Sequence, residues 1–153
     1  MKPLTTKNIN TVLKNNAVTG RYFLGAYPAC IVPSSSKQPY SFITNTKFHD
    51  EAGEHWNAWF VDKNKLTFFD SFGRDPRDNS FPEFYKDILK TFSRVSFTQY
   101  RVQDIDSVSC GYFCVHFIYT LSLKLDFNFF LEDYSDDLKM NDIIALRFYN
   151  SLK

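Results

Sequence analysis

Long apolar stretches are absent from the chain. The longest apolar run, residues 110–125, is interrupted by a histidine, a threonine, a serine and a lysine, whereas a membrane helix needs about 20 predominantly apolar residues. The opening residues, MKPLTTKNIN, also lack the apolar centre of a secretory signal peptide. We therefore expect a protein that neither spans a membrane nor is secreted.

An excess of charge of either sign is also absent. The chain has 18 basic and 17 acidic residues, for a formal net charge of +1. No block of like charges forms a tail. This balance excludes a strongly basic nucleic-acid binder and leaves room only for weak, local nucleic-acid contact.

Cysteine is scarce, and internal repeats and low-complexity segments are absent. The 153 residues include three cysteines, Cys30, Cys110 and Cys114, which cannot all pair. We expect free thiols in a reducing compartment, so packing or reactivity must explain each of them. A chain of this length can bury a core without disulfides, and we expect one domain over residues 1–153.

Aromatic residues, by contrast, make up 18% of the sequence and are expected to fill a core. The spacing of apolar residues predicts an α+β fold, because helices and strands are interspersed without repeating as βαβ units. We expect a mixed, mostly antiparallel sheet packed against a central helix. Helices are predicted at 5–16, 81–92, 110–125 and 136–152, and strands within 20–28, 40–46 and 96–102 and on both sides of a turn at 62–65.

The predicted hairpin brings a histidine close to a carboxylate. If residues 63–64 form a two-residue loop, Asn57 falls opposite Asp70. His55 lies on the same face as Asn57 and is then the diagonal neighbour of Asp70, with Cβ atoms roughly 7–8 Å apart. An imidazole and a carboxylate at that separation can form a hydrogen bond. Taken alone, His55 could equally be a surface histidine of a strand.

Cys110 stands at the polar entrance of the central helix. Ser107 or Ser109 can cap this helix, and Gly111 leaves room for a substrate backbone. At a helix N-terminus the dipole and the free N–H groups favour a thiolate, and reactive cysteines have their pKa lowered from about 8.5 to roughly 3.5–7.5. Cys110 is therefore a candidate nucleophile.

The other thiols and histidines are interpreted as structural. Cys114 lies one turn further into the helix, in apolar surroundings, and Cys30 is also expected to pack. His116 lies about 120° round the helix from Cys110 and about 9 Å along it, so it cannot be the base for that thiol. A zinc site using these cysteines with His116 or His49 would lack a Cys-x-x-Cys pair, so no metal is expected.

Gln103 is a candidate donor to an oxyanion. It precedes Cys110 by seven residues with a polar turn between them. Its side-chain amide could fold back to the helix entrance and act there with the backbone N–H of Cys110. Gln99 competes for this role on spacing alone.

Four segments that carry these residues resemble, in order, the adenovirus-type endopeptidase (adenain) family of cysteine proteases. The segments are YFLGAYP, FITNTKFHDEAGEHW, LTFFDSFG and VQDIDSVSCGYFC. The family belongs with the ubiquitin-like-protein proteases in a papain-like, circularly rearranged superfamily. The first segment and the glutamine-to-cysteine spacing favour the adenain branch.

The resemblance implies a role for each candidate residue. His55 would be the base and Asp70 its orienter, while Cys110 would be the nucleophile and Gln103 an oxyanion donor. Trp56 would shield the site and flank the scissile peptide. The family chemistry is cleavage after Gly in viral capsid and core precursors, through an acyl-enzyme. The implied source is a DNA virus, virophage or Maverick-like element, with the protein in the virion and in the cytoplasm or nucleus of the host cell.

The sequence departs from the adenovirus enzymes in one stretch. Those enzymes hold an activating peptide through a disulfide to a cysteine upstream of the oxyanion glutamine, and residues 90–103 contain no cysteine. Disulfide-linked activation is therefore not expected, and no cofactor is required in this interpretation, although an activating peptide or DNA stays open. We expect a monomer that acts on capsid or core precursors.

Two alternatives remain on the same residues. One is a deubiquitinating or deSUMOylating protease on the same fold, since both branches favour glycine before the cut. The other is a catalytically silent relative that binds a capsid or ubiquitin-like partner. The occupied catalytic positions argue against silence.

Overall fold

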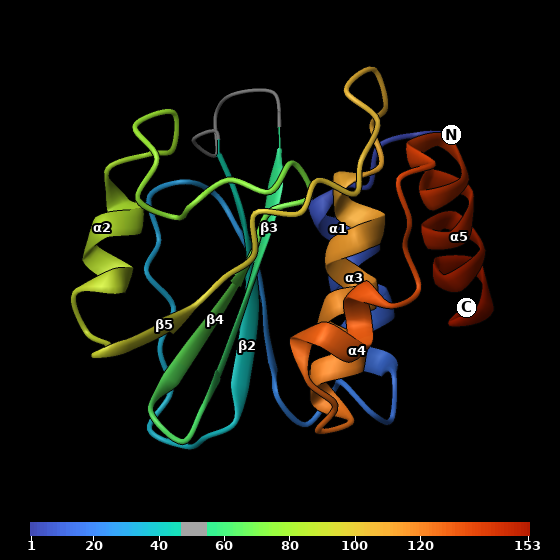
Figure 1. The fold of residues 1–153 in the computed structure, drawn as a ribbon. Coiled ribbons are helices and arrows are strands. Elements are labelled where there is room, and N and C mark those ends of the chain that lie inside the picture. The colour runs from blue at the N-terminus through green and yellow to red at the C-terminus, as the bar shows by residue number, and fades with distance from the viewer. Residues whose placement is uncertain (47–54) are drawn as a thin grey trace.

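A five-stranded sheet lies between two layers of helices in the computed structural model, which describes residues 1–46 and 55–153 (Figure 1). Helix α2 covers one face of the sheet, and the other helices cover the opposite face. The elements are α1 Thr6–Asn15, β1 Phe23–Tyr27, β2 Tyr40–Asn45, β3 Trp56–Asp62, β4 Lys65–Phe69, α2 Phe84–Leu89, β5 Arg94–Ser96, α3 Cys110–Ser122, α4 Phe127–Leu131 and α5 Leu138–Ser151.

The sheet is mixed, in the order β1-β2-β3-β4-β5. The inner pairings, β2–β3 and β3–β4, are antiparallel, whereas β1–β2 and β4–β5 at the edges are parallel. Parallel neighbours need a longer connection than a hairpin, and residues 28–39 and 70–93 supply it. The predicted α+β fold with a mixed sheet is confirmed, although antiparallel pairing is limited to the inner strands.

Helix α3 is the central helix that the sequence predicted. Every one of its residues except Tyr119 is buried. Phe117 of α3 stacks on Phe69 of β4, with ring centroids 5.3 Å apart, and burying such a side chain contributes roughly 1.5–3 kcal/mol. The apolar run is thus explained by packing inside the protein. No helix in the described parts of the chain is long and apolar enough to span a membrane.

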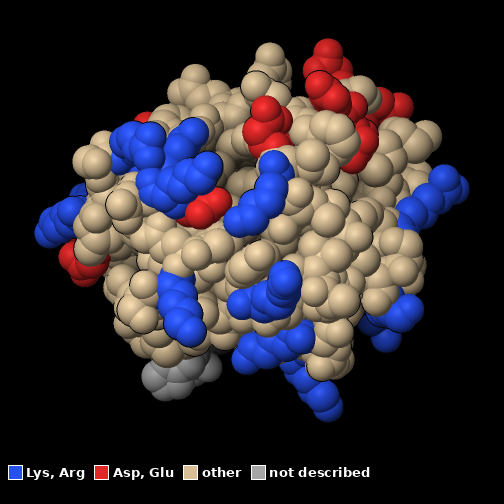
Figure 2. All heavy atoms as spheres, turned by 90° about the horizontal axis from the view of Figure 1, so that it is seen from below, with Lys and Arg blue, Asp and Glu red and all other residues tan. Residues whose placement is uncertain are grey.

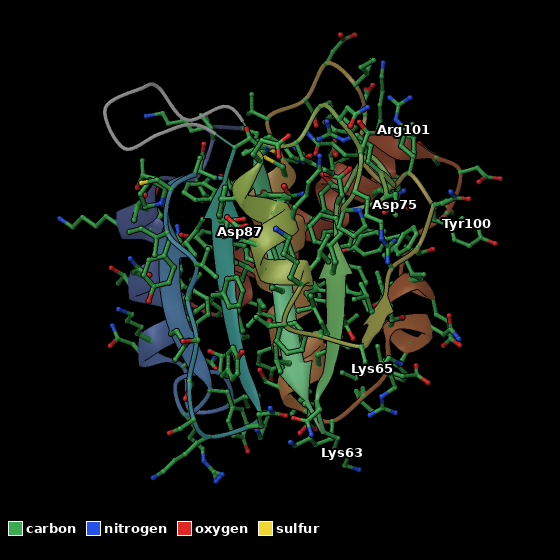
Figure 3. The ribbon with its side chains drawn as sticks, turned by 90° about the vertical axis from the view of Figure 1, so that its left-hand side faces the viewer. Lys63, Lys65, Asp75, Asp87, Tyr100 and Arg101 are labelled. Carbon is green, nitrogen blue, oxygen red and sulfur yellow. The ribbon has the colours of Figure 1, made fainter. Side chains whose placement is uncertain are left out.

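Two observed elements differ from the prediction. The strand expected at 96–102 ends at Ser96, because the backbone N–H groups of Val102 and Gln103 donate to the carbonyl of Ser71 instead of to a strand. Figure 3 shows Arg101 toward the opposite end of the molecule from Lys63. The sequence also did not predict α4, which has only five residues and begins at an Asp126 cap.

Candidate active site

The β3–β4 hairpin has the predicted register. Asp62 pairs with Lys65 around a two-residue turn, residues 63–64, whose φ angles are 52° and 61°. Two consecutive residues in this left-handed region form the turn that suits the twist of a hairpin. The ladder keeps this register along β4, so Asn57 falls opposite Asp70.

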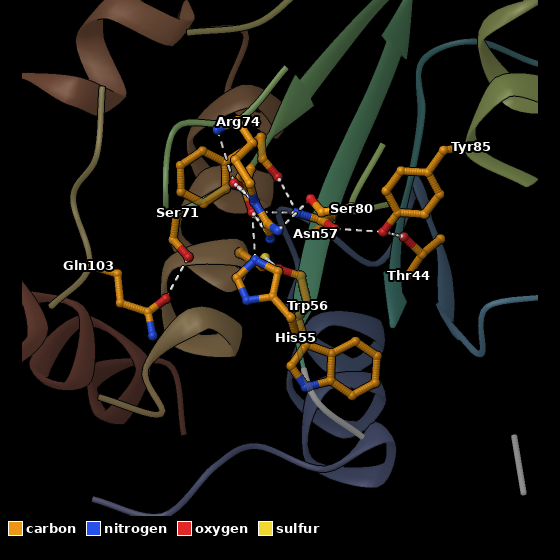
Figure 4. A network of polar contacts seen from close by, with 12 residues as sticks. Thr44, His55, Trp56, Asn57, Ser71, Arg74, Ser80, Tyr85 and Gln103 are labelled. Atoms are coloured by element: carbon orange, nitrogen blue, oxygen red, sulfur yellow. Dashed lines mark hydrogen bonds and ion pairs between the residues drawn. The ribbon is translucent and has the colours of Figure 1, made fainter. Parts of the chain in front are cut away.

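His55, labelled in Figure 4, meets Asp70 at the open end of this hairpin. Nε2 of His55 lies 2.5 Å from Oδ1 of Asp70, and the two side chains are 7% and 0% exposed. Cys110 lies close enough to His55 to raise the pKa of the imidazole. Since Nε2 faces the carboxylate, Nδ1 is the ring nitrogen left for the thiol. The histidine thus connects the carboxylate to the cysteine.

The pKa values of the pair are shifted toward the charged forms. Burial lowers the pKa of His55, but hydrogen bonds with Asp70 and Cys110 and the charges of both outweigh it and raise the pKa to about 9. Burial raises the pKa of Asp70, but hydrogen bonds from His55 and Arg74 and their positive charges outweigh it and lower the pKa to about 2. At neutral pH the arrangement therefore favours an imidazolium beside a carboxylate.

Two residues besides the histidine orient the Asp70 carboxylate. The backbone N–H and Nε of Arg74 donate to Oδ2 at 3.0 and 2.9 Å, and Nδ2 of Asn57 donates to Oδ1 at 2.9 Å. The Arg74 guanidinium lies 4.2 Å from the centroid of the Phe81 ring. Both carboxylate oxygens are therefore fixed, and the buried charge has a counter-charge.

Gly73 forms the turn that brings Arg74 back to Asp70. Its φ is +75°, and its N–H donates to the carbonyl of Asp70 at 2.8 Å. A Cβ at this position would lie 2.7 Å from the carbonyl oxygen of Gln99. Only glycine fits both the backbone angle and the space.

Replacing Gly73 with alanine should therefore destabilise the protein by about 2–4 kcal/mol, because backbone strain and a backbone clash add. Urea unfolding measures this loss. The same variant should react more slowly at Cys110, since Arg74 would hold Asp70 less well. An unchanged unfolding midpoint would show that the backbone at residue 73 tolerates a side chain.

Cys110 is the first residue of α3 and is 7% exposed. No side chain caps this helix: Ser109, predicted as a possible cap, instead donates to Asp142 at 2.7 Å, and the Ser107 hydroxyl bonds to that of Ser109. The predicted cap is therefore wrong. The positive end of the α3 dipole lies at Cys110, where it favours negative charge on the thiol or on a substrate.

Gln103 lies in the same polar network as the His55–Asp70 pair. It is 1% exposed. Its Oε1 accepts a hydrogen bond from Oγ of Ser71 at 2.5 Å, and its Nε2 donates to the carbonyl of Ser107 at 2.9 Å. Gln99, the competing glutamine, is exposed. The structure therefore favours Gln103 as the amide at the site.

Trp56 and Gly111 pack on each other beside the site. The Trp56 indole N–H donates to the carbonyl of Leu4 at 3.0 Å, and the side chain is buried. A Cβ on Gly111 would lie 3.0 Å from Cβ of Leu4 and 3.2 Å from Cδ1 of Trp56. The absence of a side chain at Gly111 thus allows this contact, whereas the sequence analysis predicted that the space would admit a substrate backbone.

The remaining thiols and histidine lie outside this pair. Cys114 is fully buried, donates to the carbonyl of Trp56 at 3.4 Å, and has its pKa raised by burial. His116 bonds to Tyr134, and burial lowers its pKa to about 4. Both agree with the packing roles predicted. Cys30 is exposed, so the expectation that it packs is wrong.

No group of three or more His, Cys, Asp or Glu side chains in residues 1–46 and 55–153 is arranged to hold a metal ion. His49, which the zinc alternative included, lies outside the described residues. The same is true of most of the loop in the segment FITNTKFHDEAGEHW.

Sequence reasoning missed three residues that support the site: Ser71, Arg74 and Tyr85. The Tyr85 hydroxyl donates to Oδ1 of Asn57 at 2.5 Å and so fixes the amide that contacts Asp70. The strand pairing already placed Asn57 opposite Asp70, which was a usable signal. Arg74 gave no such signal, because it depends on the backbone turn at residue 73.

The fold is shared with a solved protease, although the sequence matches no protein-family profile and no curated protein. The structure is similar to a crystal structure of ASFV pS273R protease, with a TM-score of 0.61 and 17% identity, covering 94% of this chain and 66% of that one. A selenomethionine form of the same protease gives a TM-score of 0.56 and 20% identity, covering 94% and 67%. The chain therefore spans about two thirds of the length of that protease and has its papain-like fold.

Proposed function

We propose that the protein is a cysteine endopeptidase with Cys110 as nucleophile, His55 as base and Asp70 as orienter. The observation that carries the proposal is the single imidazole that hydrogen-bonds a buried carboxylate and whose pKa is raised by a neighbouring cysteine at a helix N-terminus. These are the parts of an activated thiol nucleophile. The likeness in fold to a protease supports the same assignment.

The geometry suggests a two-stage reaction. The thiol proton already resides on His55 as the imidazolium, and Sγ of Cys110 attacks the carbonyl carbon of the scissile peptide. The oxyanion that forms accepts hydrogen bonds from the Cys110 N–H and from Nε2 of Gln103. The imidazolium then gives its proton to the leaving amine, which leaves a thioester. Water, deprotonated by His55, hydrolyses that thioester and regenerates the thiol.

The proposed substrates are capsid or core precursor polypeptides, cleaved after Gly inside a virion or an infected host cell. This part rests on the resemblance to the adenain family, because the structural neighbour is named only as a protease. Incubating the purified protein with the capsid proteins of its source and with ubiquitin-like conjugates, and reading new termini by mass spectrometry, tests the substrate class. Cuts confined to ubiquitin-like conjugates would favour a deconjugating protease instead.

A peptide series that varies only the residue before the scissile bond should show a preference for Gly of at least about tenfold in kcat/KM. One or two missing methylenes are worth roughly 1–3 kcal/mol in a fitted pocket, and a narrow channel penalises any Cβ. Because Trp56 and Gly111 pack together, the narrowness has to come from other residues. Equal rates with Gly, Leu and Phe would remove the glycine preference from the proposal.

Nucleic-acid contact remains a proposal for the end of the molecule that carries the β3–β4 hairpin. Figure 2 shows Lys and Arg side chains spread over this face, with most visible acidic side chains toward one edge. The groove of about 520 Å³ there is lined by Lys63, Lys65 and Lys124, but also by two aspartates, one of which pairs with Lys124. The partial compensation supports weak contact only. Loss of binding above about 0.2 M salt is expected.

A further inference from the structure

Ser71 makes three hydrogen bonds to the segment that carries the proposed oxyanion donor. Its carbonyl accepts from the backbone N–H groups of Val102 and Gln103 at 2.9 and 3.1 Å. Its hydroxyl donates to Oε1 of Gln103 at 2.5 Å. Ser71 directly follows Asp70 in the chain, so one dipeptide contacts both the base and the oxyanion donor. Figure 4 shows the amide oxygen of Gln103 facing Ser71 and the nitrogen facing away.

The partners of Gln103 determine which way its amide faces. A carbonyl oxygen can only accept, so the group that faces the carbonyl of Ser107 must be the NH₂. The oxygen must then face the Ser71 hydroxyl. One hydrogen of Nε2 is used by Ser107, and the second has no acceptor among the described residues. That second N–H could donate a hydrogen bond to an oxyanion.

We propose that Ser71 is a positioning residue that holds the Gln103 amide with its free N–H toward the oxyanion. The inference rests on the proposed function. Without the Ser71 hydroxyl, the buried amide oxygen would lose its hydrogen-bond donor, which is unfavourable. The side chain would leave this orientation to recover a hydrogen bond. Oxyanion stabilisation would then fall, while the Cys110–His55 pair would keep its contacts.

The test begins with Ser71→Ala. It should lower kcat for a cleaved peptide roughly 10- to 100-fold with little change in KM, below the ~10²–10³-fold loss expected from deleting a whole oxyanion donor. The rate of alkylation of Cys110 by iodoacetamide should not change, because that reaction forms no oxyanion. A matched control is Ser41→Ala, since Ser41 is a fully buried serine whose hydroxyl has no partner among the described residues.

A double-mutant cycle separates positioning from general damage to the fold. In a Gln103→Ala background, Ser71→Ala should change kcat by less than about twofold, because the group it positions is gone. Equal losses in both backgrounds would overturn the proposal, as would a wild-type kcat for Ser71→Ala. Ser71→Cys, which keeps a weak donor in a slightly larger side chain, should give a kcat between those of the wild type and Ser71→Ala.

A measurement that needs no turnover keeps this inference separate from the proposed function. With ¹⁵N-labelled glutamine, the wild-type side chain of Gln103 should give two distinct NH₂ resonances, one protected from exchange with water by the Ser107 bond. Ser71→Ala should shift both and speed their exchange. Resonances that are the same in the wild type and in Ser71→Ala would overturn the role of Ser71, even if the wild type cleaves nothing. If instead the resonances respond to Ser71→Ala but Cys110 is unreactive and no peptide is cleaved, only the proposed protease function would be rejected.

Discussion

Replacing Cys110 with alanine should abolish peptide hydrolysis and leave the fold intact. Loss of the nucleophile of a comparable hydrolase lowers kcat on the order of 10⁶-fold. The residue lies at the N-terminal end of α3, and the substitution removes only one sulfur atom from the edge of the core cluster, so most of the packing remains. Peptide cleavage and circular dichroism of the same preparation measure both parts.

Cys114→Ala is the matched control for this experiment. Its thiol is fully buried and bonded to the carbonyl of Trp56, and burial raises its pKa. The variant should lose about 1–2 kcal/mol of stability, from one hydrogen bond and a small cavity, and keep its activity. If Cys114→Ala were inactive and Cys110→Ala active, the nucleophile would be misassigned.

Removing either member of the His55–Asp70 pair should cost activity by different amounts. His55→Ala removes the proton acceptor, a loss on the order of 10²–10⁴-fold. Asp70→Asn should lower kcat roughly 10- to 100-fold. This is less than in a serine protease, because a thiol nucleophile depends less on the residue that orients its base. This variant should also be less stable by about 3–5 kcal/mol, since it leaves Arg74 partly buried without its counter-charge.

The pH profile tests the same contact independently. The pKa of His55 is raised to about 9, so the rate of the wild type should fall on the basic side near that pH as the imidazolium loses its proton. In Asp70→Asn the raising effect of the carboxylate is gone and the Arg74 charge remains nearby, so the basic limb should move to lower pH. An unmoved limb would contradict a hydrogen bond between residues 55 and 70 in solution.

Stability should depend on pH in opposite directions for the two groups. The raised pKa of His55 contributes stability that is complete below about pH 6.5 and is lost as the pH rises through about 9. The lowered pKa of Asp70 contributes stability that is present above about pH 4 and is lost as the pH falls toward 2. Asp70→Asn should lose the acid dependence and weaken the basic one, which Cys110 also supports, in urea unfolding measured across this range.

Local geometry explains why the sequence predicted the centre of the site. A two-residue turn and the two-residue period of strands suffice to place His55 near Asp70, because both rules act within one hairpin. The apolar run of α3 likewise predicted a central helix. Its cap was predicted wrongly because Ser109 bonds to Asp142, which is 33 residues further along the chain. Sequence spacing contains no information about such a distant partner.

The same limit explains the residues that were missed. The contact of Arg74 with Asp70 requires a left-handed glycine at residue 73, and the contact of Ser71 with Gln103 requires residues 97–102 to leave the sheet edge. Both depend on how loops pack after the regular elements have formed. Gly111 shows the converse case: the sequence found the residue, but its neighbours Leu4 and Trp56 show that it serves packing.

The order in which the two halves of the site can form has a consequence for the newly made chain. His55 and Asp70 belong to one hairpin and can meet early, because few residues separate them. Cys110 lies 55 residues beyond His55 in the chain and meets it only when α3 docks against β3. Before that docking the thiol has neither a base nor an ordered helix end. Chains that are still being synthesised therefore lack the assembled site, and cleavage activity in urea should disappear together with the folded state.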